Sequence, residues 1–278
     1  MTSQAEKGAA FRDLHLGPDI FLMPNAWDEG SAKILAASGV SALATTSGGV
    51  NWARGREDYI YEVPKAEMLA AYGQIARAVD LPVSGDLENG YGDTTEDVAE
   101  TIRMAIAKGM VGGGIEDSTA DPAKPLFDEA EAVDRIRAAR TAADESGIPF
   151  TLTARCEAFC FDVPDPLGTA IRRGNLFREA GADCIFIPGP NDAAIIGTIV
   201  REIDAPISQV VGLGDPPVTV AMLRDLGVRR ISTGGSLARG CLGYLQRAAR
   251  TMVDEGTFGY AAEAVSDPAI NDFMRAAK

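Results

Sequence analysis

Residues 82–93 read PVSGDLENGYGD, a short β-type run that ends in two carboxylates and a glycine-containing turn. In a strand, residues i and i+2 point to the same face, so Asp86 and Glu88 are expected to project side by side while Leu87 packs behind them. Two adjacent anions repel each other unless a cation or a proton lies between them. Gly90 and Gly92 let the backbone bend sharply and approach a ligand. The stretch therefore predicts half of a site for a hard metal ion at the end of a strand.

The same pattern, a short apolar run followed by a helical stretch, recurs along the whole chain. Apolar and β-branched runs predict strands at 20–24, 41–46, 82–87, 112–116, 149–155, 183–188, 206–211 and 228–233. Helical periodicity predicts helices at 28–38, 65–80, 94–109, 128–146, 166–181, 191–203, 217–226 and 236–255. Eight strand–helix units are typical of a (β/α)8 barrel, the TIM barrel, and a doubly wound open sheet is the alternative. We expect one α/β barrel domain over residues 1–278, in which 237–278 form the last barrel helix and a C-terminal extension.

Composition excludes several classes of function. The net charge of −14 argues against nucleic acid as a partner, and no apolar stretch is long enough to span a membrane. The four cysteines lack the spacing of metal sites, which favours free thiols in a reducing cytoplasm. The N-terminus lacks the apolar segment of a signal peptide, in agreement with this location. The single histidine, His15, nearly excludes a Ser-His-Asp triad or a multi-histidine metal site, and we expect it to have an ordinary surface or helix role.

Polar residues collect where the predicted strands end, which is where barrel enzymes place their chemistry. These residues include Asn25, Thr46, Ser47, Gly48, Gly49, Asp86, Glu88, Glu116, Arg155, Glu157 and Gln209. Four carboxylates from three strands would meet around one arginine, a ligand set that suits Mg²⁺ or Mn²⁺. The alternative is an ion-pair network that only holds loops together.

Two features at the strand ends are suited to an anionic substrate. The planar guanidinium of Arg155 binds a carboxylate or phosphonate through two parallel hydrogen bonds, although a structural salt bridge to Glu157 or Glu116 would also explain it. Thr46 to Gly49 offer hydroxyl and backbone N–H groups, and Gln209 is a further substrate-binding candidate. Strand alternation turns Cys156 towards the helices, which favours a structural role for its thiol.

Several segments together resemble the isocitrate lyase/phosphoenolpyruvate mutase superfamily. They are PNAWDEGSA (24–32), TTSGGV (45–50), DLENGYGD (86–93), IEDS (115–118), LTARCEAF (152–159), REAGADCIF (178–186) and GVRRISTGGSLARG (227–240). The resemblance implies a (β/α)8 barrel, Mg²⁺ and a 2-oxo acid or related small carboxylate as substrate. It also implies a homo-oligomer, a dimer or tetramer, whose subunits exchange a C-terminal helix.

The resemblance also assigns roles to individual carboxylates. Asp86 matches the carboxylate nearest the metal, and Glu88 stands where many members have Asp. Glu116 matches the acidic residue of the family's IED motif. Asp58 matches a further carboxylate that acts through water. The resemblance thus implies metal ligands at Asp86, Glu88 and Glu116. It implies catalytic roles for Asp58, Glu116 and Arg155.

The loop after the IED motif departs from the family. Ser47 and Gly48 match the substrate-gripping loop and Arg155 matches the substrate-binding arginine, but residues 118–128 read STADPAKPLFD. This segment lacks the Lys-x-Cys-Gly-His run of the lyases and the Lys-x-Asn-Ser run of the mutases. Lys124 is its only cationic candidate for a catalytic group.

These observations predict a Mg²⁺-dependent enzyme that cleaves a C–C bond in an oxaloacetate-like or methylisocitrate-like carboxylate through an enolate. The loop 117–128 would then act as a lid that excludes water. One alternative is C–P bond chemistry, as in phosphonopyruvate hydrolase or phosphoenolpyruvate mutase. The other is a non-catalytic barrel that binds a carboxylate.

Overall fold

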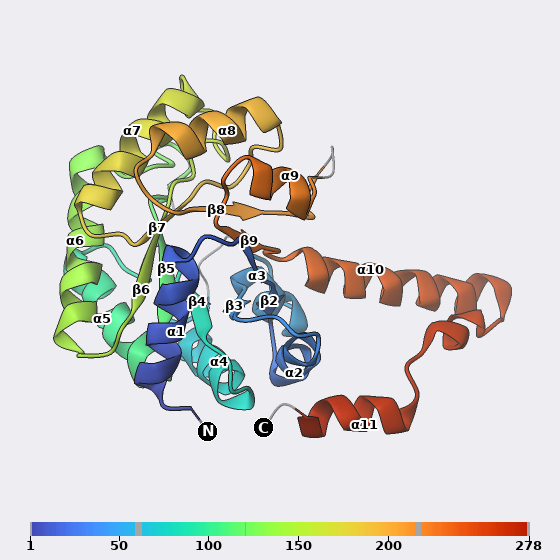
Figure 1. The fold of residues 1–278 in the computed structure, drawn as a ribbon. Helices are drawn as coiled ribbons and strands as arrows, with labels where there is room; N and C mark the ends of the chain where they lie inside the picture. Colours follow the sequence, from blue (N-terminus) through green and yellow to red (C-terminus); the bar gives the residue numbers. More distant parts are fainter. Residues whose placement is uncertain (1, 59–62, 120, 215–217, 277–278) are drawn as a thin grey trace.

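The nine strands found in the described residues lie in one parallel sheet that closes into a barrel (Figure 1). The computed structural model describes residues 2–58, 63–119, 121–214 and 218–276. In these ranges the strands are β1 Phe21–Met23, β2 Asn25–Ala26, β3 Leu43–Thr45, β4 Val83–Asp86, β5 Gly112–Glu116, β6 Thr151–Arg155, β7 Cys184–Phe186, β8 Ile207–Val210 and β9 Arg230–Ser232. The predicted TIM barrel is therefore confirmed.

The barrel closes through its first strand, which Pro24 divides into β1 and β2. The strand order is β1-β9-β8-β7-β6-β5-β4-β3-β2, so the two ends of the sheet are consecutive in the chain. Phe21 of β1 pairs with Arg230 of β9, and Asn25 of β2 pairs with Ala44 of β3. Proline has no N–H to donate to a ladder, and its carbonyl accepts a bond from the Ala44 N–H at 3.0 Å.

The described residues form eleven α-helices, most of which follow a strand and cover the outside of the barrel (Figure 1). They are α1 Gln4–Leu16, α2 Glu29–Ala37, α3 Ser47–Ala53, α4 Lys65–Ala78, α5 Thr95–Ala107, α6 Glu129–Glu145, α7 Pro166–Glu179, α8 Ala193–Glu202, α9 Val220–Asp225, α10 Ser236–Arg250 and α11 Asp267–Ala276. Each predicted helix contains one of them. Pro217, the first residue of the predicted helix 217–226, lies outside the described residues.

Two helices, α1 and α3, were not predicted from the sequence. Helix α1 buries only Gly8, Phe11 and His15, which is too few for a clear apolar period, although its capping box at Ser3 and Glu6 is a readable start signal. Helix α3 has only seven residues and carries two glycines in its first turn.

Helix α1 packs at the end of the barrel where the strands begin. Phe11 lies at the edge of the Phe21 ring, in a small cluster with Met23 and Ala44. His15 lies between the two phenylalanine rings and is 3% exposed, so it is a buried helical residue and not a surface one. Helix α1 therefore covers the end of the barrel where the strands begin, and the opposite end stays open.

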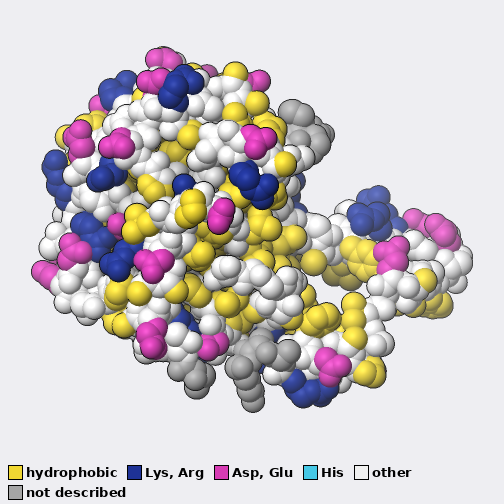
Figure 2. Space-filling view, in the orientation of Figure 1, with side chains coloured by type: hydrophobic (Ala, Val, Ile, Leu, Met, Phe, Trp, Pro, Cys, Tyr) yellow, Lys and Arg dark blue, Asp and Glu magenta, His cyan; other side chains and the backbone are white. Residues whose placement is uncertain are grey.

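The chain after β9 leaves the barrel as an arm (Figure 1). Helix α10 continues into a π-helical turn, Thr251–Glu255, and a 3-10 turn, Gly259–Glu263, before α11 returns to α2. There, the Lys33 ammonium donates to the Met274 carbonyl at 2.8 Å. Apolar side chains stay exposed along the arm in Figure 2, with Val253 at 83% and Phe258 at 66%. No helix in the described ranges is both long and apolar enough to cross a membrane.

Candidate active site

A cavity of about 510 Å³ opens at the carboxyl ends of the strands. Its walls contain many small residues, among them Ala44, Ser84 and Gly114, and these leave the barrel interior hollow. Around its mouth lie the acidic residues Asp58, Asp86, Glu88 and Glu116 together with Arg155. The structure therefore brings most of the predicted site residues into one place.

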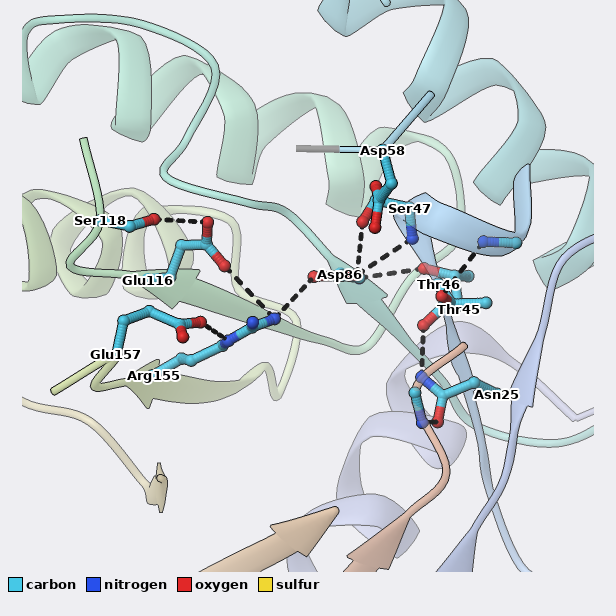
Figure 3. Close-up of polar contacts among 12 residues, drawn as sticks. Asn25, Thr45, Thr46, Ser47, Asp58, Asp86, Glu116, Ser118, Arg155 and Glu157 are labelled. Carbon is cyan, nitrogen blue, oxygen red and sulfur yellow. Dashed lines mark hydrogen bonds and ion pairs between the residues drawn. The ribbon is translucent and has the colours of Figure 1, made fainter. Parts of the chain in front are cut away.

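Asp86, the last residue of β4, is fixed by the first turn of α3 (Figure 3). Its Oδ2 accepts hydrogen bonds from the Ser47 N–H and the Ser47 hydroxyl, both at 3.0 Å. Its own N–H donates to Thr45 Oγ1 at 2.9 Å. These three hydrogen bonds hold the Asp86 side chain in a defined orientation at the start of α3.

Glu88 follows the end of β4 and lies in a left-handed turn, with φ of +48°. The strand ends at Asp86, so a turn, and not the predicted strand alternation, brings the two carboxylates together. Glu88 Oε2 is buried and has no hydrogen-bond partner among the described residues. Burial, followed by the charges of Asp86 and Glu116, raises the pKa of Glu88 to about 9. A carboxylate in this position needs either a proton or a cation.

The raised pKa of Glu88 predicts how stability depends on pH in metal-free protein. The folded state keeps the Glu88 proton up to pH of about 9, whereas the unfolded chain loses it near the ordinary value of 4.5. Since the folded state binds more protons in this window, the free energy of unfolding should fall as pH rises, by at most about 1.4 kcal/mol per unit. In urea unfolding with a chelator present, the free energy of unfolding of Glu88→Gln should change less with pH than that of the wild type. The exposed control Glu202→Gln should keep the wild-type slope, and equal slopes for all three proteins would contradict the prediction.

Glu116, Arg155 and Glu157 form a buried charged cluster opposite Asp86 (Figure 3). The Arg155 Nε is ion-paired with Glu157, and its Nη1 lies 3.3 Å from Glu116 Oε2 and 3.9 Å from Asp86 Oδ1. The Ser118 hydroxyl donates to Glu116 Oε1 at 2.7 Å. Burial raises the pKa of Glu116, although Arg155 acts in the opposite direction. Arg155 thus makes both salt bridges that were considered as its structural explanation, and it also faces the cavity.

Asp58 reaches the mouth from the segment after α3. Its Oδ1 accepts a long bond of 3.4 Å from the Asn51 side-chain amide. Gly48 permits this approach, because a Cβ at Gly48 would lie only 2.6 Å from Asp58 Oδ2. Thr46 caps α3, with its hydroxyl accepting from the Gly49 N–H, and Thr46, Ser47 and Gly48 line the cavity.

Three predicted site residues, Gly49, Gln209 and Lys124, do not line the cavity. The Gly49 N–H donates to the Thr46 hydroxyl inside the protein. The Gln209 amide is buried and donates to the Pro190 carbonyl at 2.7 Å, because Ser208 and Val210 take the inward positions of β8. Lys124 is exposed and pairs with Asp128 at 2.8 Å. Neither side chain is placed to touch a ligand in this conformation. Cys156 is buried in the core among the helices, as the alternation predicts, and burial raises its pKa.

Arg173, which was not predicted from the sequence, holds the two ends of the loop 117–128 together; we call these ends, at Asp117 and Phe127, the neck of the loop. Residue 120 of this loop lies outside the described residues. Arg173 Nη1 donates to Asp117 Oδ2 at 2.8 Å, and Nη2 donates to the Phe127 carbonyl at 2.7 Å. Asp117 Oδ1 in turn accepts from the Glu157 N–H at 2.8 Å. Arg173 therefore ties both ends of the loop to the segment that carries Glu157.

We expect Arg173→Gln to lower the free energy of unfolding by about 3–5 kcal/mol, because it leaves the buried Asp117 without its cation. Urea unfolding monitored by circular dichroism measures this change. Arg201→Gln, which removes an exposed ion pair with Glu202, should cost no more than about 1 kcal/mol. Similar losses for both variants would show that the neck is not held in this way.

The mouth fits a hydrated divalent cation better than a metal in an all-protein cage. Four carboxylates line the cavity there, and Arg155 lies within ion-pair distance of two of them, Asp86 and Glu116, while Arg230 and Arg239 line other parts of the same cavity. The buried Glu88 Oε2 has no donor among the described residues. In the part of the chain that is described, no three His, Cys, Asp or Glu groups converge closely enough to ligate one ion directly. Mg²⁺ commonly keeps several waters and uses one or two carboxylates, so the arrangement is compatible with it.

Comparisons with known proteins agree with this geometry. The family model described as phosphoenolpyruvate phosphomutase matches residues 11–253. The chain belongs to the isocitrate lyase/phosphoenolpyruvate mutase superfamily. An uncharacterised protein of Mycobacterium tuberculosis is 31% identical over 245 residues, covering 88% of this chain and 89% of its own. The 2-methylisocitrate lyase of Halalkalibacterium halodurans is 26% identical, covering 92% and 85%.

Solved structures of superfamily members show the same barrel. A candidate lyase/mutase from Burkholderia cenocepacia J2315 is 43% identical, with a TM-score of 0.94 over 98% of this chain and 96% of the other. Oxaloacetate acetylhydrolase bound to oxalate has a TM-score of 0.88 over 99% and 95%, at 22% identity, which shows a shared fold. Relatives with a named activity include a 2-methylisocitrate lyase and a carboxyvinyl-carboxyphosphonate phosphorylmutase, which supports the prediction that this chain is an enzyme.

Proposed function

We propose that the protein is a Mg²⁺-dependent lyase that cleaves a C–C bond in a small 2-oxo or 2-hydroxy carboxylate. The observation that carries this proposal is the group of four carboxylates around Arg155 at the mouth, with the buried Glu88 Oε2 lacking a donor. Such a group is stable when a cation neutralises it. Mg²⁺ supplies, when bound, positive charge next to the substrate oxygens on which negative charge develops.

The residues of the mouth divide into three tasks. Asp86, oriented by Ser47, would hold the ion, and Glu88 and Glu116 would hold it directly or through its waters. Arg155, fixed by Glu157, would face an anionic end of the substrate. At the start of α3 the Gly48 N–H would be the further donor, because the Ser47 and Gly49 N–H groups already donate to Asp86 and Thr46. Asp58 and Glu116 line the same cavity and would be the groups that move protons.

Relatives with named activities support C–C chemistry. They include the 2-methylisocitrate lyase of Halalkalibacterium halodurans and the 2,3-dimethylmalate lyase of Eubacterium barkeri, which is 27% identical over 189 residues. One observation favours the alternative of C–P chemistry. A candidate phosphonomutase from Burkholderia cenocepacia J2315 is 36% identical, with a TM-score of 0.82. Assays with candidate substrates are therefore needed to distinguish C–C cleavage from C–P cleavage.

A substrate panel with and without Mg²⁺ tests the proposal. We expect Mg²⁺-dependent pyruvate or glyoxylate release, or loss of oxaloacetate, from the 2-oxo and 2-hydroxy dicarboxylates. Phosphate release from phosphonopyruvate would instead establish the C–P alternative. Ligand-dependent thermal stabilisation without turnover of any substrate would indicate the non-catalytic carboxylate-binding barrel.

We also propose that the protein forms a homo-oligomer through the arm. The apolar side chains of Leu245, Val253 and Phe258 are exposed in the single chain, which is typical of surfaces that pack against another protein. Helix α11 lies against α2 of its own chain here, so exchange of this helix between subunits stays a prediction. Sedimentation of the purified protein should give a dimer or tetramer, and a monomer at micromolar concentration would refute the proposal.

A further inference from the structure

Arg230 in β9 is a buried cation whose partners are all uncharged. Its side chain is 3% exposed, and among the described residues no carboxylate lies within ion-pair distance. Nε donates to Ser208 Oγ at 2.9 Å, and Nη1 donates to Thr153 Oγ1 at 3.0 Å. A buried charge without a counter-charge is costly, so the fold retains Arg230 against a considerable penalty.

His15 does not supply the missing negative charge, but it fixes the direction of Arg230. Nδ1 of His15 lies 2.8 Å from the Phe11 carbonyl, which only accepts, and Nε2 lies 3.1 Å from Arg230 Nη1, which only donates. The ring is therefore neutral, with its proton on Nδ1 and its lone pair towards Arg230. Burial and the charge of Arg230 lower the pKa of His15 to about 3, in agreement with this tautomer.

Arg230 lines the same cavity as the acidic residues of the mouth, but it lies deeper in the barrel, at the level of Thr153 and not of Arg155. Arg230 and Thr153 both line the cavity, and Thr153 precedes Arg155 by two residues in β6. Two residues of a tilted barrel strand correspond to about 5–7 Å of depth. Ser84 precedes Asp86 by the same two residues and also lines the cavity. A cationic floor with hydroxyl groups thus lies below the proposed metal and Arg155.

We propose that Arg230 forms a floor subsite for a second carboxylate of the substrate, whose 2-oxo carboxylate end lies at Asp86 and Arg155. This inference rests on the proposed function and narrows its substrate to a 2-oxo or 2-hydroxy dicarboxylate. A chain of a few carbon atoms spans the depth between the two layers. One guanidinium flanked by hydroxyls carries the single positive charge that one carboxylate neutralises. Its Nε and Nη1 hydrogens are directed at Ser208, Thr153 and His15, which leaves Nη2 to donate to the carboxylate.

The test compares two probes that share one end and differ at the other. Pyruvate has the 2-oxo carboxylate end alone, whereas 2-oxoglutarate adds a distal carboxylate. With Mg²⁺ present, calorimetry should show that wild-type protein binds 2-oxoglutarate at least about tenfold more tightly than pyruvate. Arg230→Gln should remove this preference while the Kd for pyruvate changes less than about twofold. Arg230→Lys, which keeps the charge but not the guanidinium, should retain part of the preference.

Arg229→Gln is the matched control, because it removes the same charge from the neighbouring position of the chain and Arg229 does not line the cavity. It should keep the wild-type preference. The inference is wrong if the wild type does not prefer 2-oxoglutarate to pyruvate, or if Arg230→Gln keeps that preference. In either case the proposed function still stands, provided that pyruvate binding needs Mg²⁺. Arg230-dependent binding of 2-oxoglutarate without any Mg²⁺ requirement would support the subsite and refute the proposed metal. Absence of binding by both probes would refute both.

A structure of the wild-type protein with Mg²⁺ and 2-oxoglutarate decides the inference even if Arg230→Gln does not fold. The distal carboxylate should lie within hydrogen-bond distance of Arg230. A distal carboxylate bound at any other place in the cavity would overturn the subsite.

Discussion

Asp86→Asn is expected to lower Mg²⁺-dependent turnover by about a thousandfold or more. Asparagine keeps the shape and the oxygen that accepts from Ser47, but it removes the charge that the proposed metal site needs. Loss of several kcal/mol of transition-state stabilisation corresponds to a factor of this size. Initial rates over a range of Mg²⁺ concentrations, with the substrate found in the panel, measure the effect. Calorimetry should show that the variant no longer binds Mg²⁺.

Stability separates this loss of function from a loss of folding. Asp86 raises the pKa of its neighbour Glu88, so removing one of the two charges should leave the free energy of unfolding unchanged or increase it. Asp134→Asn, which removes an exposed carboxylate paired with Arg137, should keep both activity and Mg²⁺ binding. Undiminished Mg²⁺-dependent turnover in Asp86→Asn would show that the ion, if bound, is held elsewhere.

The barrel was predictable because buried parallel strands leave continuous apolar runs in the sequence. The runs at 112–116 and 149–155 contain β5 and β6 within a residue or two of their ends. Helix α1 left a weaker signal because it buries few residues of its own, and its packing against Phe21 depends on contacts distant in sequence. Pro24 similarly divides the first strand in a way that only closure of the barrel explains.

The predicted ends of the strands gave the correct position of the mouth. They did not show which side chains of each strand point into the barrel. Asp86, Glu116 and Arg155 converge because parallel strands end at the same rim of the barrel. Gln209 was assigned to the site and points away from it, because a strand buried on both faces shows no polar alternation from which its inward face can be recognised. The same ambiguity hides Arg230, since the pair Arg229-Arg230 does not reveal which arginine enters the barrel.

Arg155→Gln is expected to lower the free energy of unfolding by about 3–5 kcal/mol and to abolish turnover, because Arg155 is the cation shared by Glu116 and Glu157. Arg155 lowers the pKa of Glu88 and acts in the same direction on Glu116. Without it Glu116 binds its proton more strongly in the folded state, so the deficit should be small near pH 4.5 and should grow as pH rises. Glu88, which keeps its proton up to pH of about 9 in the wild type, adds to the deficit only above that pH. Urea unfolding at a series of pH values in a chelator measures this dependence.

Two further measurements separate a charge effect from a packing effect at Arg155. Arg172→Gln, which removes an exposed pair with Glu129, should cost no more than about 1 kcal/mol at any pH. If the carboxylates of the mouth bind a divalent cation, Mg²⁺ should raise the unfolding temperature of Arg155→Gln more than that of the wild type, because the ion replaces the lost positive charge. A pH-independent deficit that Mg²⁺ does not reduce would mean that Arg155 stabilises the barrel through packing against Phe186, whose ring centroid lies 5.3 Å from its guanidinium carbon. The carboxylate cluster would then be a structural ion-pair network, and the proposed metal site would lose its main support.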